Sequence, residues 1–213
     1  MNNSQNKKKE KLILFDWGNI VESHTTGYNC YNAWDDLFHK CGSDTTEVIF
    51  SKINQYGISC AKTIKEFEKI YNILQKEYNF NTTYEQFIDY YKEIFDKIDY
   101  YKDVAAYEAS LKDKCYIGIF SDLLVFDKER LNKQVDLSNY DYTFLSFEMG
   151  LKKPDKNLYE KIQNNLPFKP KDILFIDDRI ENVEMAKQMD WNSFQTTGLQ
   201  LDDIKRVCDD FLK

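Results

Sequence analysis

The sequence predicts an α/β fold in which a parallel sheet carries helices on both faces. Three short apolar runs, at 12–15, 115–120 and 173–176, indicate buried strands, and each is followed by an acidic or hydroxyl residue. Weaker strand patterns lie at 142–145 and 193–195. Helical periodicity alternates with these strands, as is typical of a parallel sheet, and it is found at 125–131, 157–164 and 180–189.

The interval 23–101 has a different character, because it shows no convincing strand pattern and is rich in Tyr, Phe, Lys and Glu. Apolar residues recur every three or four positions in 64–74 and again in 87–95. We interpret these aromatic stripes as the core of a helix bundle in preference to a ligand-stacking surface. The pattern predicts four helices, at about 28–40, 44–56, 63–78 and 83–98.

Composition limits the partners that the protein can have. The 213 residues are 42% hydrophobic, which is enough to bury a sizeable core. Because 36 acidic residues outnumber 29 basic ones, the formal net charge is −7, which argues against a nucleic-acid partner. We therefore expect a small-molecule ligand, no nucleic acid, no membrane, and a monomer or homodimer.

The five cysteines indicate a reducing compartment, since they are odd in number and form no C-x-x-C pair. Basic residues at 7–9 precede only a short apolar run, so we expect no export signal and a cytoplasmic protein. Cys30, His39 and Cys41 match no standard zinc-ligand spacing, and we interpret them as scattered side chains.

Several chemically active side chains follow the predicted strands directly. Asp16, Ser121 and the pair Asp177-Asp178 each stand just beyond a strand, and the carboxyl ends of parallel strands share one ligand-binding crevice. Lys153 would join them from a loop before a helix, with Pro154 as the first helical residue. The sequence thus predicts a pocket that holds three carboxylates, a hydroxyl and an ammonium group.

Three carboxylates at such close range would raise one another's pKa unless a cation lay between them. A hard dication with oxygen ligands removes the conflict, and Mg²⁺ is the usual choice where a phosphate completes the coordination shell. An acid after a strand is also a common helix N-cap. The coincidence at several matching strand ends favours the metal site.

The order of these pieces resembles the haloacid dehalogenase superfamily of phosphatases and related hydrolases. The resemblance is carried by four short motifs and spans nearly the whole chain from Lys11; the motifs lie at 14–19, 119–122, 150–155 and 175–179. The first motif reads D-x-G-N-I, and with K-P and D-D it resembles the glucose-1-phosphate phosphatase-like and epoxide-hydrolase N-terminal-like branch.

This resemblance implies a Rossmann-like three-layer core with a parallel sheet and an inserted helical cap built as a four-helix bundle. The strand-poor interval lies where such a cap belongs. The expected boundaries are a core made of 11–22 and 102–213 and a cap made of 23–101.

The resemblance also implies the roles of residues that handle phosphate. Asp16 would be the nucleophile that becomes an aspartyl phosphate. Ser121 and Asp122 would contact the phosphoryl group, and Lys153 would neutralise its charge and orient Asp16. Such a site suits phosphoryl transfer, which depends on positioning and charge stabilisation.

A second set of residues would hold the cofactor that the resemblance implies, Mg²⁺. Asp16 and Asp178 would bind the ion directly, Asp177 would bind it through water, and the backbone carbonyl of Gly18 would be a further ligand.

Gly18 departs from the superfamily pattern, since its phosphatases usually carry a second aspartate two residues after the nucleophile. That aspartate protonates the leaving group, and losing such an acid typically costs on the order of 10²–10⁴ in rate. Neither Gly18 nor the amide of Asn19 can replace it. Water, His24 or Glu22 could substitute. Trp17 beside it is either packed under the loop, which we favour, or stacked on the substrate.

The leading hypothesis is a Mg²⁺-dependent phosphatase that hydrolyses small phosphorylated metabolites, above all sugar phosphates. One alternative is a non-catalytic protein that binds phosphometabolites or a protein partner, which the glycine at position 18 motivates. Another is a 2-haloacid dehalogenase, but that chemistry expects no metal, and Asp177-Asp178 argues against it. A response-regulator receiver also uses an acidic pair, a phospho-accepting Asp and a Lys, but its acidic pair comes first in the chain and its fold has no room for the cap.

Overall fold

The structure, a computed structural model, describes residues 9–44 and 46–213, and its centre is a parallel sheet. Lys7 and Lys8 of the basic run, and position 45 of the second predicted helix, lie outside the described residues. The strand order is β3-β2-β1-β4-β5, and every pairing is parallel. The strands are β1 (Leu12–Phe15), β2 (Tyr116–Ser121), β3 (Tyr142–Leu145), β4 (Ile173–Asp177) and β5 (Asn192–Gln195).

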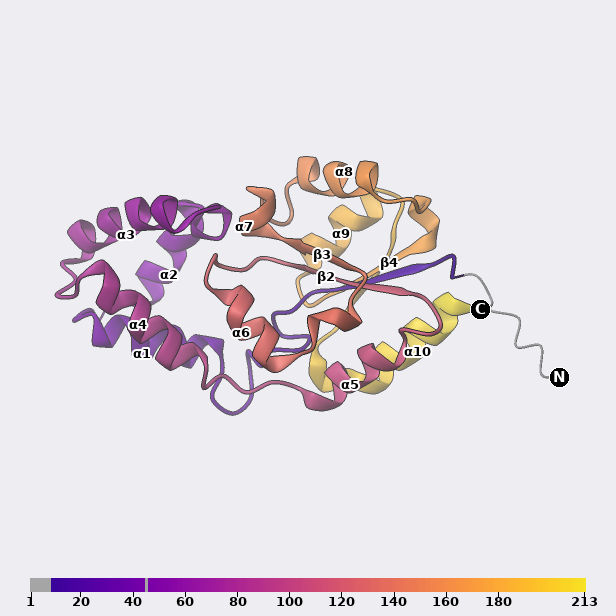
Figure 1. Ribbon diagram of the computed structural model, residues 1–213, viewed down its shortest axis with the longest axis horizontal. Helices are drawn as coiled ribbons and strands as arrows, with labels where there is room; N and C mark the ends of the chain where they lie inside the picture. Colours follow the sequence, from indigo (N-terminus) through magenta and orange to yellow (C-terminus); the bar gives the residue numbers. More distant parts are fainter. Residues whose placement is uncertain (1–8, 45) are drawn as a thin grey trace.

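Helices cover both faces of the sheet, which gives three layers (Figure 1). The helices of this part are α5 (Lys102–Ser110), α6 (Asp127–Gln134), α7 (Ser146–Met149), α8 (Lys156–Asn165), α9 (Ile180–Gln188) and α10 (Leu201–Leu212). Ile13 of β1 belongs to the same hydrophobic cluster as residues of α5, α6 and α10, whereas Leu12, on the opposite face, shares a second cluster with residues of α8 and α9.

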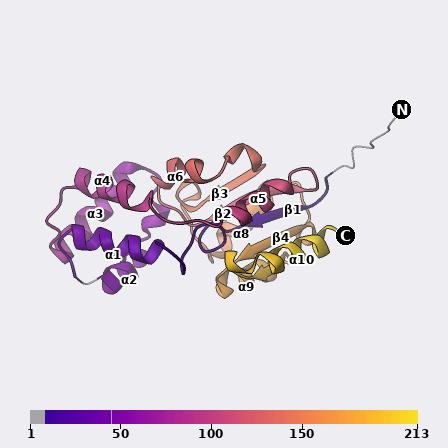
Figure 2. The ribbon, with the colours of Figure 1, turned by 90° about the horizontal axis from the view of Figure 1, so that it is seen from below.

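Four further helices form a separate lobe beyond the carboxyl ends of the strands, as Figures 1 and 2 both show. They have a hydrophobic cluster of their own. Side-chain caps begin three of them, since Asn29, Thr63 and Thr83 each accept backbone N–H bonds of the first turn. The four helices are α1 (Cys30–Lys40), α2 (Thr46–Gln55), α3 (Ile64–Tyr78) and α4 (Tyr84–Phe95).

The predicted fold class is confirmed, and the predicted strands and lobe helices lie within a few residues of the observed ones. The core and cap boundaries stay a prediction. Pro154 was wrongly placed in a helix, because α8 begins at Lys156 behind the N-cap Asp155. Helices α5, α7 and α10 were not predicted. Within the described ranges, no helix combines the length and the apolar character needed to cross a membrane.

Candidate active site

The side chains that follow strands β1, β2 and β4 meet at one edge of the sheet. Phe15 is level with Ile119 of β2 and Ile176 of β4, so Asp16, Ser121 and Asp177 all lie within two residues beyond the same level of the sheet. The backbone N–H of Asp16 donates to the carbonyl of Ile176 at 2.8 Å, which continues the β1–β4 ladder by one residue. Ser121 is buried at the end of β2. Sheet geometry therefore brings together the distant motifs.

Lys153 lies at the centre of this group and is buried. Its Nζ lies 2.8 Å from Asp16 Oδ1 and 2.6 Å from Asp177 Oδ2, and it also donates to the carbonyl of Phe120 at 3.1 Å. Burial alone would lower the pKa of the Lys153 ammonium, but Asp16, Asp177 and Asp122 raise it well above its usual range. The lysine is therefore a permanent positive charge between the carboxylates.

Burial and Lys153 act in opposite directions on the pKa values of two carboxyl groups in this site, Asp177 and Asp122. Burial raises the pKa of Asp177 even though Lys153 opposes the shift. Burial likewise raises the pKa of Asp122 to about 6, while Lys153 and its backbone N–H, which donates to Asp122 Oδ1, lower it. One oxygen of Asp122 thus accepts the Lys153 backbone N–H. Its predicted contact with phosphate stays a prediction.

The three acids could hold a cation. Asp16, Asp177 and Asp178 each place one oxygen within 4.8 Å of the others. Asn19, which adopts a left-handed backbone conformation, donates from Nδ2 to Asp178 Oδ2 at 3.0 Å. The amide oxygen Oδ1 of Asn19 is buried and has no hydrogen-bond partner among the described residues. A hydrated Mg²⁺ would supply O–H donors there, so the residues fit a magnesium ion.

Asp177 differs from its neighbours because the protein already occupies both of its oxygens. Asn182 Nδ2 lies 2.9 Å from Oδ1 and 3.0 Å from Oδ2. The backbone N–H of Arg179 donates to Oδ1 at 2.8 Å, and Lys153 Nζ donates to Oδ2. An acid held in this way suits contact with the ion through water. Sequence reasoning missed Asn182, whose signal was a polar residue one turn into the helix after the acidic pair.

Gly18 lies beside a histidine that fills the space of a missing side chain. A Cβ built on Gly18 would come within 2.9 Å of His24 Cε1 and 3.2 Å of His24 Nε2, and within 3.8 Å of Asp16 Oδ2. Burial lowers the pKa of His24, but Cys30, Asp178 and Asp16 raise it to about 9 overall. The imidazole thus stands where an aspartate at position 18 would project.

Trp17 is almost fully buried and belongs to the hydrophobic cluster under β1, as the packed alternative predicts. The backbone N–H of Trp17 donates to Asp16 Oδ1 at 2.7 Å, which helps to orient the carboxylate.

A cavity of about 640 Å³ opens from the sheet edge toward the helical lobe. Pockets of this size suit small metabolites. At the sheet end it is lined by Asp16, Ser121, Lys153 and Asp178, and at the lobe end by Trp34, Ile53, Ile58, Tyr91 and Phe95.

A buried charged network lies between these two ends, and the sequence analysis did not predict it. Arg130 pairs with Glu22, and its Nη2 lies 3.0 Å from Asp127 Oδ1. The Tyr91 hydroxyl of α4 donates to the same Asp127 oxygen at 2.6 Å, so the network joins the lobe to the core. Burial lowers the pKa of Arg130 to about 10 and raises that of Asp127 to about 6. Its sequence signal was the D-x-x-R spacing on one face of α6.

The sequence also matches a family model. Residues 10–190 match the model for haloacid dehalogenase-like hydrolases. This chain belongs to the haloacid dehalogenase-like hydrolases. The match includes all four motifs and the whole helical lobe, so the superfamily resemblance read from the motifs is confirmed, whereas the particular branch stays a prediction.

Solved structures share this haloacid dehalogenase-like fold over most of the chain. A HAD-like family hydrolase of Porphyromonas gingivalis superposes with a TM-score of 0.73 at 18% identity, covering 94% of this chain and 98% of that one. A HAD family enzyme of Bacteroides thetaiotaomicron, in complex with magnesium and inorganic phosphate, gives 0.69 at 16% identity over 89% and 95%. The L-2-haloacid dehalogenase of Xanthobacter autotrophicus gives 0.61 at 15% identity over 92% and 81%. At these identities the likeness shows the fold.

Proposed function

We propose that this hydrolase is a Mg²⁺-dependent phosphatase of small phosphorylated metabolites, with sugar phosphates as the most suitable substrates. The observation that carries the proposal is the buried triad in which Lys153 Nζ lies 2.8 Å from Asp16 Oδ1 and 2.6 Å from Asp177 Oδ2 at the edge of a metabolite-sized cavity. The Bacteroides relative, solved with magnesium and phosphate, supports this choice of ligands.

Asp16 would attack the phosphorus and carry the phosphoryl group as an aspartyl phosphate. Lys153 holds Oδ1 of this carboxylate and would neutralise charge on the phosphoryl oxygens. The buried hydroxyl of Ser121 would donate to one of these oxygens. Water would then release phosphate from Asp16.

Mg²⁺ would be held by Asp16, Asp178 and the carbonyl of Gly18, with Asp177 acting through water. When bound, it supplies positive charge that stabilises the transferring group. Asn19 and Asn182 would keep the two acids at positions 178 and 177 oriented.

His24 is the best-placed group to protonate the leaving oxygen in the absence of an aspartate at position 18. Its ring lies against Gly18 and lines the cavity. Glu22, the other candidate, is paired with Arg130. The geometry therefore favours the histidine over the glutamate.

The polar middle of the cavity supports a hydroxyl-rich substrate. Glu22, Asp127 and Arg130 line it with charged groups that pair with one another, and the aromatic residues of the lobe end can cover an apolar face. A sugar phosphate presents hydroxyls on its edges and C–H groups on its faces.

A dehalogenase remains less favoured, although the Xanthobacter enzyme shares the fold. That reaction needs no metal site, whereas here Asp178 is oriented by Asn19 and an unpartnered buried oxygen lies beside it within the described part of the chain.

Phosphate release provides the test. Purified protein with millimolar Mg²⁺ is incubated with a panel of sugar phosphates and nucleotides, and phosphate is measured with malachite green. We expect turnover by the wild type and by Asp202→Asn, whose carboxylate is fully exposed on α10, but none by Asp16→Asn. Release from no substrate above the Asp16→Asn background contradicts the proposal, and tight phosphometabolite binding in calorimetry would then favour a non-catalytic binder.

A further inference from the structure

Glu22, His24 and Cys30 bring a carboxylate, an imidazole and a thiol together beside Gly18. Each places one possible ligand atom within 4.8 Å of the other two. Glu22 is buried, the other two are half-buried, and all three line the cavity. A metal ion in the cavity could therefore reach all of them.

We propose that these three residues form a second metal site that takes Zn²⁺, distinct from the oxygen-only site of Asp16 and Asp178. A set of nitrogen, sulfur and oxygen ligands suits a borderline-soft ion, whereas Mg²⁺ prefers oxygen alone. Three protein ligands leave the fourth tetrahedral position facing the cavity. This trio differs from the scattered His39 and Cys41, which the sequence also offered.

The separation of the imidazole nitrogen and the carboxylate oxygen suits a zinc ion with little movement. His24 Nε2 lies 3.7 Å from Glu22 Oε1. Zinc bound at about 2.0–2.2 Å to each of two such atoms in tetrahedral geometry separates them by roughly 3.4 Å. The two side chains would need to approach each other by only a few tenths of an ångström.

Glu22 is already oriented for this task. Its Oε2 pairs with Arg130, which leaves Oε1 as the oxygen nearest His24. Arg130 is in turn held by Asp127. Supporting contacts of this kind fix the ligands of known metal sites.

The backbone brings Cys30 back to the other two ligands. The Cys30 N–H donates to the carbonyl of Ser23 at 3.2 Å, which closes the loop between them. Ser23 Oγ also donates to the Thr26 carbonyl at 2.7 Å. Because the loop is bonded to itself, less conformational entropy is lost when the ion binds.

The site has a consequence for hydrolysis that rests on the proposed function. Zinc bound at His24 occupies the imidazole that would protonate the leaving group. Zinc should therefore inhibit the phosphatase even when Mg²⁺ saturates the acidic site, and removal of Cys30 should relieve this inhibition.

Cobalt spectroscopy tests the site without reference to turnover. Chelator-treated full-length protein in millimolar Mg²⁺ is titrated with Co²⁺, which substitutes for zinc and gives a thiolate charge-transfer absorption in the near ultraviolet. We expect this band in the wild type, its loss in Cys30→Ser, and its retention in Cys60→Ser, a matched half-buried free thiol outside the cluster. Absence of the band in the wild type, or its persistence in Cys30→Ser, overturns the proposal.

Competition with a chromophoric chelator gives the zinc affinity. His24→Gln should keep the thiolate band at high cobalt but weaken zinc binding by at least about 100-fold, beyond the usual effect of losing a supporting contact. Because His24→Gln keeps Cys30, its thiolate band reports that the protein is folded. Weaker zinc binding in this variant therefore reflects the loss of a ligand, an explanation that Cys30→Ser alone could not distinguish from misfolding. Unchanged zinc affinity in His24→Gln contradicts the site, whereas a cobalt band in a protein that hydrolyses no phosphomonoester would count against the proposed function alone.

Discussion

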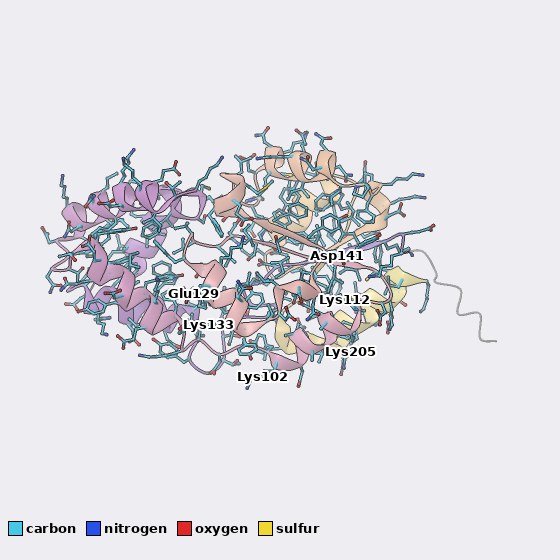
Figure 3. The ribbon with its side chains drawn as sticks, viewed as in Figure 1. Lys102, Lys112, Glu129, Lys133, Asp141 and Lys205 are labelled. Atoms are coloured by element: carbon cyan, nitrogen blue, oxygen red, sulfur yellow. The ribbon has the colours of Figure 1, made fainter. Side chains whose placement is uncertain are left out.

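Two lysines of this chain hold an aspartate at the same distance but in different surroundings. Lys153 Nζ lies 2.6 Å from Asp177, and Lys133 Nζ lies 2.6 Å from Asp96. The side chains of the first pair are 2% and 0% exposed, and those of the second are 53% and 40% exposed. Lys133 is on α6, where the core faces the helical lobe (Figure 3). The comparison shows that exposure to solvent, and not the distance between the charges, determines how strongly each partner of an ion pair depends on the other.

At the sheet edge, removal from water makes each charge depend on its partners, so a missing partner leaves an uncompensated buried charge. At the junction, water can replace either partner, and the long side chains lose entropy when they are held together. The first pair can therefore support chemistry, and the second is largely a surface feature.

Lys153→Met should have the largest effect. It leaves Asp16 and Asp177 buried without their cation, which should lower the free energy of unfolding by about 3–5 kcal/mol and abolish phosphate release. Urea unfolding in the presence of chelator measures the loss. Mg²⁺ should restore part of the stability, since it supplies positive charge to the folded state alone. A loss of less than about 1 kcal/mol would mean that the carboxylates do not need the lysine.

His24→Gln should act on rate and leave stability largely intact, because the ring lies at the cavity wall. We expect kcat to fall on the order of 10²-fold or more for alkyl phosphates, whose leaving oxygen needs a proton. For p-nitrophenyl phosphate, with a good leaving group, the fall should be much smaller. Steady-state kinetics on both substrates checks this contrast, and equal losses on both would assign His24 to substrate binding.

Glu108 tests how burial changes the pKa of a carboxyl group that lacks a lysine partner such as Lys153. Burial raises its pKa to about 8, while a hydrogen bond from Tyr140 lowers it in part; its ordinary value is 4.5. Since the folded state holds the proton more tightly, this contribution to stability is complete below about pH 4.5 and is lost as the pH rises to about 8. The loss should be on the order of 4 kcal/mol.

Urea unfolding at pH 5, 6.5 and 8 compares the wild type with Glu108→Gln, which should lack most of this pH dependence. Glu129→Gln is the control, since that side chain is 70% exposed on α6 (Figure 3). The difference in free energy of unfolding between the wild type and Glu108→Gln is the quantity compared. If it is the same at pH 5 and at pH 8, Glu108 is ionised in the folded protein over this range.

Lys133→Met should have the smallest effect, although it removes a contact as short as the one at Lys153. Because both partners are solvated, the urea midpoint and kcat should stay within experimental error of the wild type. A clear loss of stability would show that the ion pair braces the junction between α4 and α6.

The sequence was informative where strand ends fix positions. Asp16, Ser121 and Asp177 lie together because parallel strands place their ends at one edge, whatever their separation along the chain. Arg130 and Asp127 escaped prediction because their partners come from other elements, Glu22 on the first loop and Tyr91 on α4. The D-x-x-R spacing places Asp127 and Arg130 on one face of α6, but the partners on other elements depend on how the helices pack.

Two of the helices that were not predicted, α5 and α10, differ in how clear their apolar pattern is. Helix α10 carries a readable signal, since its buried residues Ile204 and Cys208 are four apart. Helix α5 buries Val104 and Glu108, so its inward face is interrupted by an acid and its apolar stripe is weak. The loop after β1 has no repeating sequence pattern. Its path determines the left-handed conformation of Asn19 and brings His24 beside Gly18, and neither feature could be predicted.

The placement of an imidazole from position 24 against Gly18 changes what can be exchanged between members of this family. Where an aspartate two residues after the nucleophile donates the proton, a foreign lobe can be grafted without touching the reactive groups. Here the proposed donor, His24, lies in the loop between β1 and α1, where the chain passes from the sheet to the helical lobe. A chimera in which this loop is exchanged together with the lobe would lose the proposed proton donor, whereas one that keeps the loop would retain it.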